Sequence, residues 1–250
     1  MSFIIKLHPE SDLTTGQVQT IIDQFNNKGE LIGDGKRNVI KIIEVEGIKY
    51  NVKSFKIPNI FNKIAYKFLR KGKAERSFEY ASKLKTMDIL TPDPQAYVIE
   101  ESFLFRRSFY ISKQLDYDFT IRKMVDDPNC DEFENVVRAF TRFTFNLHEK
   151  GIHFIDHSPG NTLIKKNGEH YLFYLVDLNR MNFGTLDFST RIKNFARLSA
   201  PDKMLEVMSD EYSKLINQPK AEVFKLMKHY ADTFRNKLLR KKRLKKRLKI

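Results

Sequence analysis

The chain has 250 residues, of which 41% are hydrophobic and 30% charged. This balance excludes an intrinsically disordered protein and supplies enough apolar residues for one large domain or two small lobes. The net charge is +14, but residues 235–250 hold ten Lys or Arg and no acid, which leaves only +4 for the rest of the chain.

The beginning of the chain is predicted to combine one helix with a β-hairpin. Residues 14–26 place apolar side chains at helical spacing. Residues 30–59 are rich in β-branched residues, and Glu46 and Gly47 supply a turn between two such runs. This pattern predicts a glycine-containing turn followed by a hairpin.

A second helix and two further strands are predicted next. Residues 62–89 favour a helix with a break near Gly72, and it ends at the "TPDP" of residues 91–94 because proline cannot continue a helix. Residues 95–115 predict two strands. The first part of the chain is therefore expected to be a small β-rich lobe with one main helix.

The second half of the chain changes character. Residues 131–151 carry a helical stripe of apolar side chains, and Gly151 is a plausible C-terminal stop. In residues 161–179, two apolar runs flank Asn167 and Gly168, a strong hairpin signal. The rest of the chain before the basic segment is predicted to be mostly helical.

The order of these elements predicts an α+β fold of two lobes with a cleft between them. We expect a β-rich N-terminal lobe over residues 1–115, a mainly helical C-terminal lobe over residues 116–233, and a basic tail over residues 234–250.

The stretch "GIHFIDHSPGNTLI" raises the question of function. It places Asp156 and Asn161 five residues apart, and Asp177 follows the predicted hairpin. Taken alone, such an Asp and Asn are explained at least as often by turn capping. Three polar groups that emerge together from apolar elements need a cation or a substrate, however, because buried carboxylates without partners are costly. Carboxylate and amide oxygens suit Mg²⁺.

This arrangement resembles the protein-kinase-like fold. The resemblance implies that Asp156 accepts or orients the acceptor hydroxyl, and that Asn161 and Asp177 bind the metal on the ATP phosphates. Lys53, in the predicted strand "YNVKSF", matches the lysine that contacts phosphate. Without these companions, Lys53 is more simply a solvated strand lysine.

The remaining cofactor-binding residues follow from the same resemblance. Gly33 and Gly35 of "IGDGKRN" stand in the place of the glycine loop. Glu75 and Glu79 share one helix face, and either can pair with Lys53; we favour Glu79 because the family's comparable helix usually places an acid near there.

Four motifs narrow the resemblance to the Kdo/WaaP lipopolysaccharide kinase family, over roughly residues 28–185. They are "VKSFKIPN", "KAERSFEYASKL" with "TPDPQAYVIE", "DHSPGNTLI" and "LVDLNRMNF". The family uses ATP and Mg²⁺ to phosphorylate a sugar hydroxyl of the lipopolysaccharide inner core, Kdo or heptose, at the cytoplasmic face of the inner membrane.

The sequence departs from the family pattern in three places. Phe154 stands where the family commonly has a histidine two residues before the catalytic Asp, and we expect His157 to be a packing residue of the loop. The glycine loop is reduced, and "DLN" replaces Asp-Phe-Gly. A protein kinase or a catalytically silent kinase-fold module, with a nucleic-acid- or ribosome-binding tail, remains the alternative function.

The basic segment and the location of the protein complete the expectations. Residues 235–250 allow three interpretations: a solvated disordered run, a nucleic-acid-binding segment, or a segment that binds anionic lipid headgroups. The lipid interpretation agrees with a glycolipid acceptor. The single cysteine, Cys130, excludes an internal disulfide, and no stretch approaches the ~18 apolar residues of a membrane helix. We therefore expect a cytoplasmic protein that is peripheral on the inner face of the cytoplasmic membrane.

Overall fold

The computed structural model describes residues 2–33, 38–55, 71–101 and 107–247. The chain divides into two compact units. Unit 1 is Met1–Asp116 with Asp177–Asn179, and unit 2 is Tyr117–Val176 with Arg180–Ile250. A three-residue segment that follows the second predicted hairpin thus belongs to the N-terminal unit.

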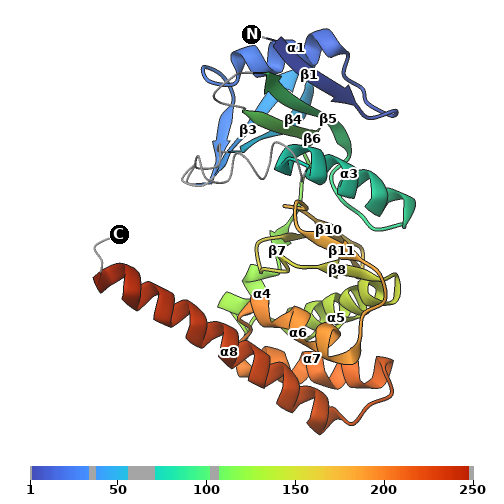
Figure 1. Cartoon of the computed structure of the whole chain (residues 1–250). Helices are drawn as coiled ribbons and strands as arrows, with labels where there is room; N and C mark the ends of the chain where they lie inside the picture. Colours follow the sequence, from blue (N-terminus) through green and yellow to red (C-terminus); the bar gives the residue numbers. More distant parts are fainter. Residues whose placement is uncertain (1, 34–37, 56–70, 102–106, 248–250) are drawn as a thin grey trace. The chain divides into compact units, whose positions relative to one another are not determined.

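Unit 1 is built on an antiparallel six-stranded sheet with the strand order β1-β5-β6-β4-β3-β2 (Figure 1). Its elements are β1 (Ser2–Leu7), α1 (Thr15–Gln24), β2 (Glu30–Ile32), β3 (Asn38–Val45), β4 (Ile48–Phe55), α3 (Lys73–Thr86), β5 (Pro94–Glu101) and β6 (Ser108–Lys113). The predicted hairpin is confirmed, with Val45 opposite Ile48. Glu46 and Gly47 both have positive φ, which matches the twist that a two-residue hairpin turn requires.

Helices α1 and α3 cover opposite faces of the sheet. The apolar stripe of α1, with Val18, Ile21 and Ile22, packs in one cluster with Tyr50 and Val52 of β4. Phe78 of α3 contacts the ring of Tyr97 on β5, which alternates with the residues that face α1. Side chains of β4 that alternate with Tyr50 and Val52 therefore point to the α3 face.

Unit 2 is mainly helical and carries two small sheets. Its elements are β7 (Phe119–Thr120), α4 (Arg122–Asp126), α5 (Phe133–Glu149), β8 (Ile152–Phe154), β9 (Thr162–Asn167), β10 (His170–Leu175), β11 (Met181–Phe183), α6 (Phe188–Asn194), the 3₁₀ helix η1 (Phe195–Leu198), α7 (Asp202–Leu215) and α8 (Lys220–Arg247). The sheets have the orders β10-β9-β7 and β11-β8. The core lies where α5 packs against α7 and α7 against α8, with side chains such as Phe140, Met208 and Met227 almost fully buried.

The predicted helix of residues 131–151 is α5, and it ends as expected. Gly151 follows it with φ +68°, in the left-handed region that glycine adopts freely. The Gly151 carbonyl accepts from the Gly184 amide at 2.9 Å, so the end of α5 is tied to the chain beyond β11.

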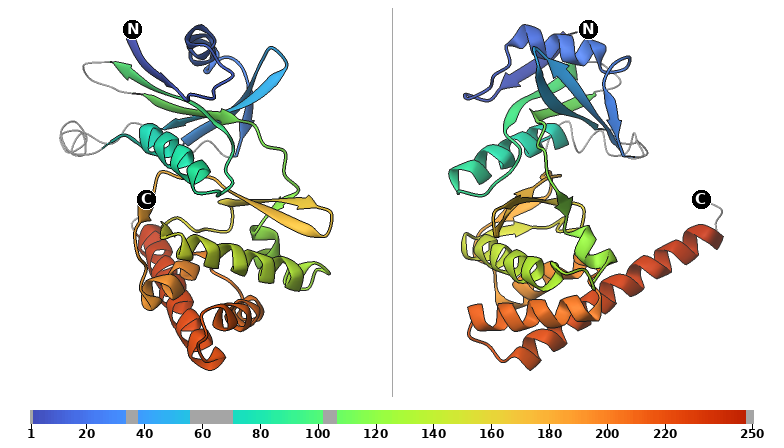
Figure 2. Two further views of the ribbon diagram at one scale, coloured as in Figure 1. Left: turned by 90° about the vertical axis from the view of Figure 1, so that its right-hand side faces the viewer. Right: turned by 180° about the vertical axis from the view of Figure 1, so that it is seen from behind.

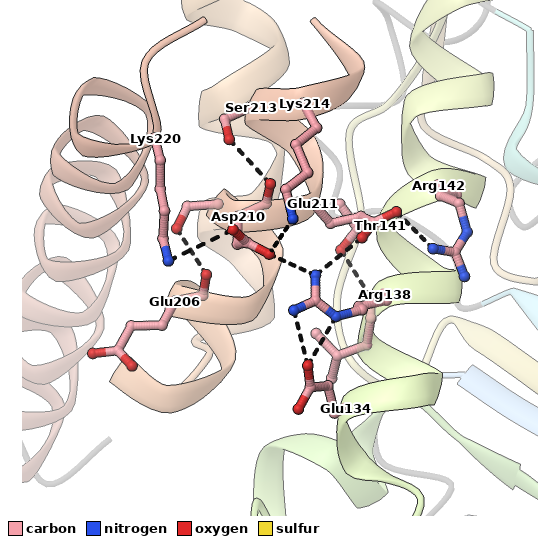
Figure 3. Close-up of polar contacts among 12 residues, drawn as sticks. Glu134, Arg138, Thr141, Arg142, Glu206, Asp210, Glu211, Ser213, Lys214 and Lys220 are labelled. Atoms are coloured by element: carbon pink, nitrogen blue, oxygen red, sulfur yellow. Dashed lines mark hydrogen bonds and ion pairs between the residues drawn. The ribbon is translucent and has the colours of Figure 1, made fainter. Parts of the chain in front are cut away.

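A charged network joins α5 to α7 on the surface of unit 2 (Figure 3). Arg138 of α5 lies between Glu134 and the acidic pair Asp210 and Glu211 of α7, with Nη1 2.7 Å and 3.0 Å from the two α7 carboxylates. Hydrogen bonds from Lys214 and Arg138 lower the pKa of Asp210 to about 2. Arg138 thus neutralises two acids that would otherwise repel each other.

The basic C-terminal segment is the second half of α8. The first half buries Val223, Met227 and Ala231, while the second half exposes Leu239 and Leu244 together with its Lys and Arg residues. Figures 1 and 2 show this half extending beyond the other helices of unit 2. The expected boundary at residue 234 falls inside the helix. Among the described residues, no helix is long and apolar enough to cross a membrane.

Candidate functional site

Lys53 lies in the middle of the sheet of unit 1. It is on β4, opposite Ile40 of β3 and Tyr110 of β6, and points to the face away from α1. Its ammonium lies 2.5 Å from Oδ1 of Asp177, and only 11% of its side chain is exposed. A largely buried lysine needs a partner for its charge, and Asp177 is that partner.

Asp177 has an unusual backbone conformation. Its φ is +59°, which is uncommon outside glycine and is found more often in Asp and Asn than in other residues. The side-chain amide of Asn179 donates to Oδ1 at 2.7 Å, so Oδ1 accepts from both Asn179 and Lys53. No hydrogen bond to Oδ2 is recorded among the described residues. The carboxylate is thus held by two donors on a backbone conformation that few residues adopt.

In unit 2, the loop between β8 and β9 is closed by its own hydrogen bonds. The carbonyl of Asp156 accepts from the Ser158 amide at 2.7 Å and from the Asn161 side-chain amide at 2.9 Å. The backbone amide of Asn161 donates to the Ser158 carbonyl. Because Nδ2 of Asn161 is used within the loop, its Oδ1 is the atom left for a further partner.

The ends of this loop are fastened to neighbouring strands. The Ile155 amide donates to the Arg180 carbonyl at 3.2 Å, just before β11. The Val176 amide donates to the Asn161 carbonyl at 3.0 Å, just after β10. The backbone of the loop is therefore anchored beside both Asp156 and Asn161.

A buried cluster of polar side chains contacts the loop from the side of α5, α6 and α7. Asn194, at the end of α6, donates to the Phe154 carbonyl at 2.9 Å, and its Oδ1 lies 3.1 Å from His148 Nε2 and 3.4 Å from His157 Nδ1. Oδ1 can only accept, so both histidines donate these hydrogens. Nδ1 of His148 then accepts from the hydroxyl of Tyr212 at 2.8 Å.

Burial keeps these two histidines neutral. Desolvation lowers the pKa of His148 to about 4 and that of His157 to about 3. His157 is fully buried and contacts the rings of Phe140 and Phe154, as expected of a loop-packing residue. Phe154, at the position of the family histidine, is also fully buried. Asn194 and His157 therefore support the loop backbone beside Asp156.

The side chain of Asp156 has a partner that the motifs did not suggest. Nη2 of Arg197, in η1, lies 2.6 Å from Oδ1 of Asp156. Arg197 and Asn194 were both missed from the sequence because they lie in a region without a recognisable motif. Asn179 carried a weak signal, since it is the last residue of the "DLN" that replaces Asp-Phe-Gly.

The other expected cofactor-binding residues have different outcomes. Glu79 of α3 pairs with Lys71, so the pair between Lys53 and Glu79 is not formed in this structure. Gly33 has φ +77°, and no atom of the described residues lies within 4 Å of the position that a Cβ would take, which agrees with a loop that a ligand approaches closely. Gly35 lies outside the described residues.

The donor atoms fit a divalent cation of the magnesium type in chemical kind. Asp177 of unit 1 offers a carboxylate oxygen, and Asn161 of unit 2 offers an amide oxygen. Taken separately, each is a hard ligand of the kind that Mg²⁺ prefers. Among the described residues, no group of three or more His, Cys, Asp or Glu side chains could hold a metal. A cation bound by either residue would therefore need further ligands, such as substrate phosphates and water.

Comparison with known proteins identifies the fold. No family model and no curated protein sequence matches the chain. Among solved structures, the chain is similar to one described as WaaP in complex with acyl carrier protein, with a TM-score of 0.62 and 16% sequence identity. The match covers 95% of this chain and 98% of that one.

The chain therefore has the α+β, protein-kinase-like fold of WaaP. The β-rich N-terminal region and the helical C-terminal region agree with this. WaaP gives its name to the family that the sequence motifs resemble, so motif and fold point the same way. At 16% identity the likeness establishes the fold and leaves activity to be argued from the residues.

Proposed function

We propose that this protein is an ATP- and Mg²⁺-dependent kinase that phosphorylates a sugar hydroxyl of the lipopolysaccharide inner core. The observation that carries the proposal is the ion pair of Lys53 with Asp177. In a protein-kinase-like fold, a strand lysine and the aspartate after the hairpin are the groups that meet the nucleotide phosphates and their metal.

The proposed chemistry is the in-line transfer of the γ-phosphoryl group. Asp156 accepts the proton of the sugar hydroxyl as its oxygen bonds to phosphorus, and ADP leaves. Lys53 neutralises charge on the phosphates, and Gly33 and Gly35 offer backbone amides to them. Catalysis of this kind depends on positioning and charge neutralisation rather than on a covalent enzyme intermediate.

Asn161 and Asp177 would hold Mg²⁺ through Oδ1 and a carboxylate oxygen, respectively. The ion supplies charge neutralisation at the phosphates when it is bound. Glu79 stays a proposed member of the nucleotide site only through a change of partner, since it is paired with Lys71 here.

The proposal is tested by measuring phosphate transfer from ATP with Mg²⁺ to purified lipid A–core oligosaccharide, and in parallel to protein substrates. Labelled phosphate on the glycolipid, dependent on Mg²⁺, is the expected result. Labelling of proteins alone would favour a protein kinase. ATP binding without transfer to either acceptor would favour a silent binding module.

The basic half of α8 is proposed to attach the protein to an anionic membrane surface, in keeping with a glycolipid acceptor and a peripheral location at the inner face of the cytoplasmic membrane. Residues 235–250 carry ten basic residues, each worth about 1 kcal/mol near such a surface. Leu238, Leu239 and Leu244 are exposed but form no single stripe, so attachment is electrostatic rather than by insertion.

This attachment is tested with vesicles of zwitterionic lipid that contain or lack anionic lipid. Binding should require the anionic lipid and fall steeply as salt is raised. A variant with Arg240, Lys241, Lys242 and Arg243 changed to Gln should bind weakly yet keep its turnover of a soluble acceptor. Vesicle binding that does not depend on salt or on lipid charge would contradict the attachment, and tight binding of RNA in its place would favour a nucleic-acid partner.

The WaaP structure contains an acyl carrier protein, so such a protein is a further candidate partner, to be tested by co-purification.

A further inference from the structure

Arg197 holds the side chain of the proposed catalytic base. Its Nη2 lies 2.6 Å from Oδ1 of Asp156, a short charge-assisted hydrogen bond between residues 41 apart in the chain. The contact uses one carboxylate oxygen only. It therefore fixes the orientation of the carboxylate while leaving Oδ2 for another partner.

Arg197 is itself held in place by α8. Its guanidinium carbon lies 5.5 Å from the centre of the Phe234 ring, within the range of a cation–π contact. Next along α8, Arg235 donates to the Ala200 carbonyl at 3.2 Å, which ties the chain after η1 to the same helix. Nε of Arg197 is buried and has no hydrogen-bond partner among the described residues. The side chain is thus partly packed, with Nε buried and the guanidinium in contact with α8.

The ordinary explanation is a partly exposed ion pair, which contributes little. Three features argue against it. The acid is Asp156 itself, within the loop. The guanidinium contacts the ring of Phe234. Nε of Arg197 is buried without a hydrogen-bond partner among the described residues, while Nη2 contacts the carboxylate. Arginine also offers a planar, rigid donor fork that lysine lacks.

We propose that Arg197 is a positioning residue for the phosphoryl transfer. It locks Asp156 with Oδ1 engaged, so that Oδ2 faces the acceptor hydroxyl, and Phe234 keeps Arg197 in that pose. The inference rests on the proposed function for its catalytic meaning. Its structural part, that Arg197 orders the loop from residue 155 to residue 161, stands independently of any activity.

Steady-state kinetics of Arg197→Ala, Arg197→Lys and Phe234→Ala test the catalytic part. Arg197→Ala should lower kcat about tenfold or more, with the KM for ATP within about twofold, because the residue acts on Asp156 and not on the nucleotide. Arg197→Lys should recover only part of the loss, and Phe234→Ala should fall between. Lys228→Ala is the control, because it breaks an ion pair between α8 and Asp202 of α7, and it should leave kcat unchanged.

Amide hydrogen exchange of the same variants separates this inference from the proposed function. Arg197→Ala should raise the exchange rates of the Ser158 and Asn161 amides about tenfold and leave those of α7 unchanged. If the loop amides exchange faster in Arg197→Ala but the wild type has no kinase activity, the inference that Arg197 orders the loop is supported and the proposed function is contradicted. Unchanged loop exchange with unchanged kcat would overturn the inference. A rise in kcat would also overturn it, because Arg197 would then be blocking the base. Should Arg197→Ala fail to fold, Arg197→Lys and Phe234→Ala carry the same comparison.

Discussion

Lys53 and Asp177 form an ion pair of 2.5 Å although 124 residues separate them in the chain. The lysine comes from the central part of the sheet. The aspartate comes from a three-residue segment that belongs to unit 1, although the residues before and after it belong to unit 2. Asp177 adopts a positive φ to reach this place. This pair is the observation on which the proposed nucleotide site rests, and the first prediction tests it.

The first prediction concerns this pair. Lys53→Met should lower ATP turnover about 100-fold or more, because phosphate charge is then left without its cation. Lys49→Met, on the same strand but exposed, should have turnover within about twofold of the wild type.

Asp177→Asn should weaken Mg²⁺-dependent ATP binding, measured by calorimetry with and without Mg²⁺. An Asp177→Asn protein that binds Mg·ATP normally would argue against the metal-binding role.

The second prediction concerns pH. His148 and His157 are neutral in the folded protein because burial lowers their pKa values to about 4 and about 3, while an unfolded histidine titrates near 6.5. The unfolded state therefore binds protons that the folded state does not. The contribution of the two neutral histidines to the free energy of unfolding is fully present above about pH 7, and it should be lost progressively as the pH drops from 6.5 toward 4.

Urea unfolding at pH 7.5 and pH 5.0 measures this loss. Each histidine should contribute about 2 kcal/mol to the fall in the free energy of unfolding. His229→Gln removes an exposed histidine of α8 and should leave the fall unchanged. Equal stability at the two pH values would show that the two histidines are not buried as described.

The third prediction concerns the charged network between α5 and α7. Arg138→Ala should reduce the free energy of unfolding by about 2 kcal/mol, since Asp210 and Glu211 lose a shared partner. Arg142→Ala is the matched control, because Arg142 is half exposed and contacts only Glu211 in the network. Its effect should stay within about 0.5 kcal/mol. Similar losses for the two variants would mean that the network acts only through general surface charge.

The fourth prediction concerns the end of α5. Gly151→Ala places a Cβ 2.9 Å from the Gly184 carbonyl oxygen at a positive φ, so both strain and a clash should cost about 2 kcal/mol of stability. Gly16→Ala, in α1 with open space around it, should be neutral or stabilising by up to about 1 kcal/mol. Thermal denaturation of both variants measures the difference, and equal melting temperatures would refute the assignment of strain to Gly151.

Elements encoded by local periodicity could be predicted from the sequence. The hairpin of β3 and β4 and the helix α5 lie where the patterns placed them, because turn residues and apolar stripes act over a few residues. The second hairpin is confirmed as well, but Asn167 pairs with His170, so the turn residues are Gly168 and Glu169. Gly168 has φ +61° and is the first turn residue, whereas the Asn-Gly pattern had placed Asn167 in the turn.

Features that depend on distant partners could not be predicted. β1 was not among the predicted elements, and it joins the sheet by pairing with β5 almost a hundred residues away. The face shared by Glu75 and Glu79 identified a charged side of α3 but could not decide that Glu79 meets Lys71. The basic half of α8 has no apolar period of its own; it is helical because it continues a helix whose first half is packed.

The residues of the candidate site also divide into those that local motifs could identify and those that only the tertiary structure reveals. Lys53, Asp156, Asn161 and Asp177 could be named because each stands in a short motif at a suitable spacing. Arg197 and Asn194 could not be named, since their roles come only from tertiary contact with the loop. Sequence motifs therefore identified the proposed reacting groups, and the structure added the residues that orient them.

The central claim is that Asp156 serves phosphoryl transfer to a sugar hydroxyl, and the most direct measurement is the transfer of labelled γ-phosphate from ATP to lipid A–core oligosaccharide by the wild type and by Asp156→Ala. Asp131→Asn, an exposed acid before α5, is the control. We predict Mg²⁺-dependent labelling by the wild type and the control, and a loss of about 100-fold or more in Asp156→Ala. Labelling by Asp156→Ala at the wild-type rate would contradict the account.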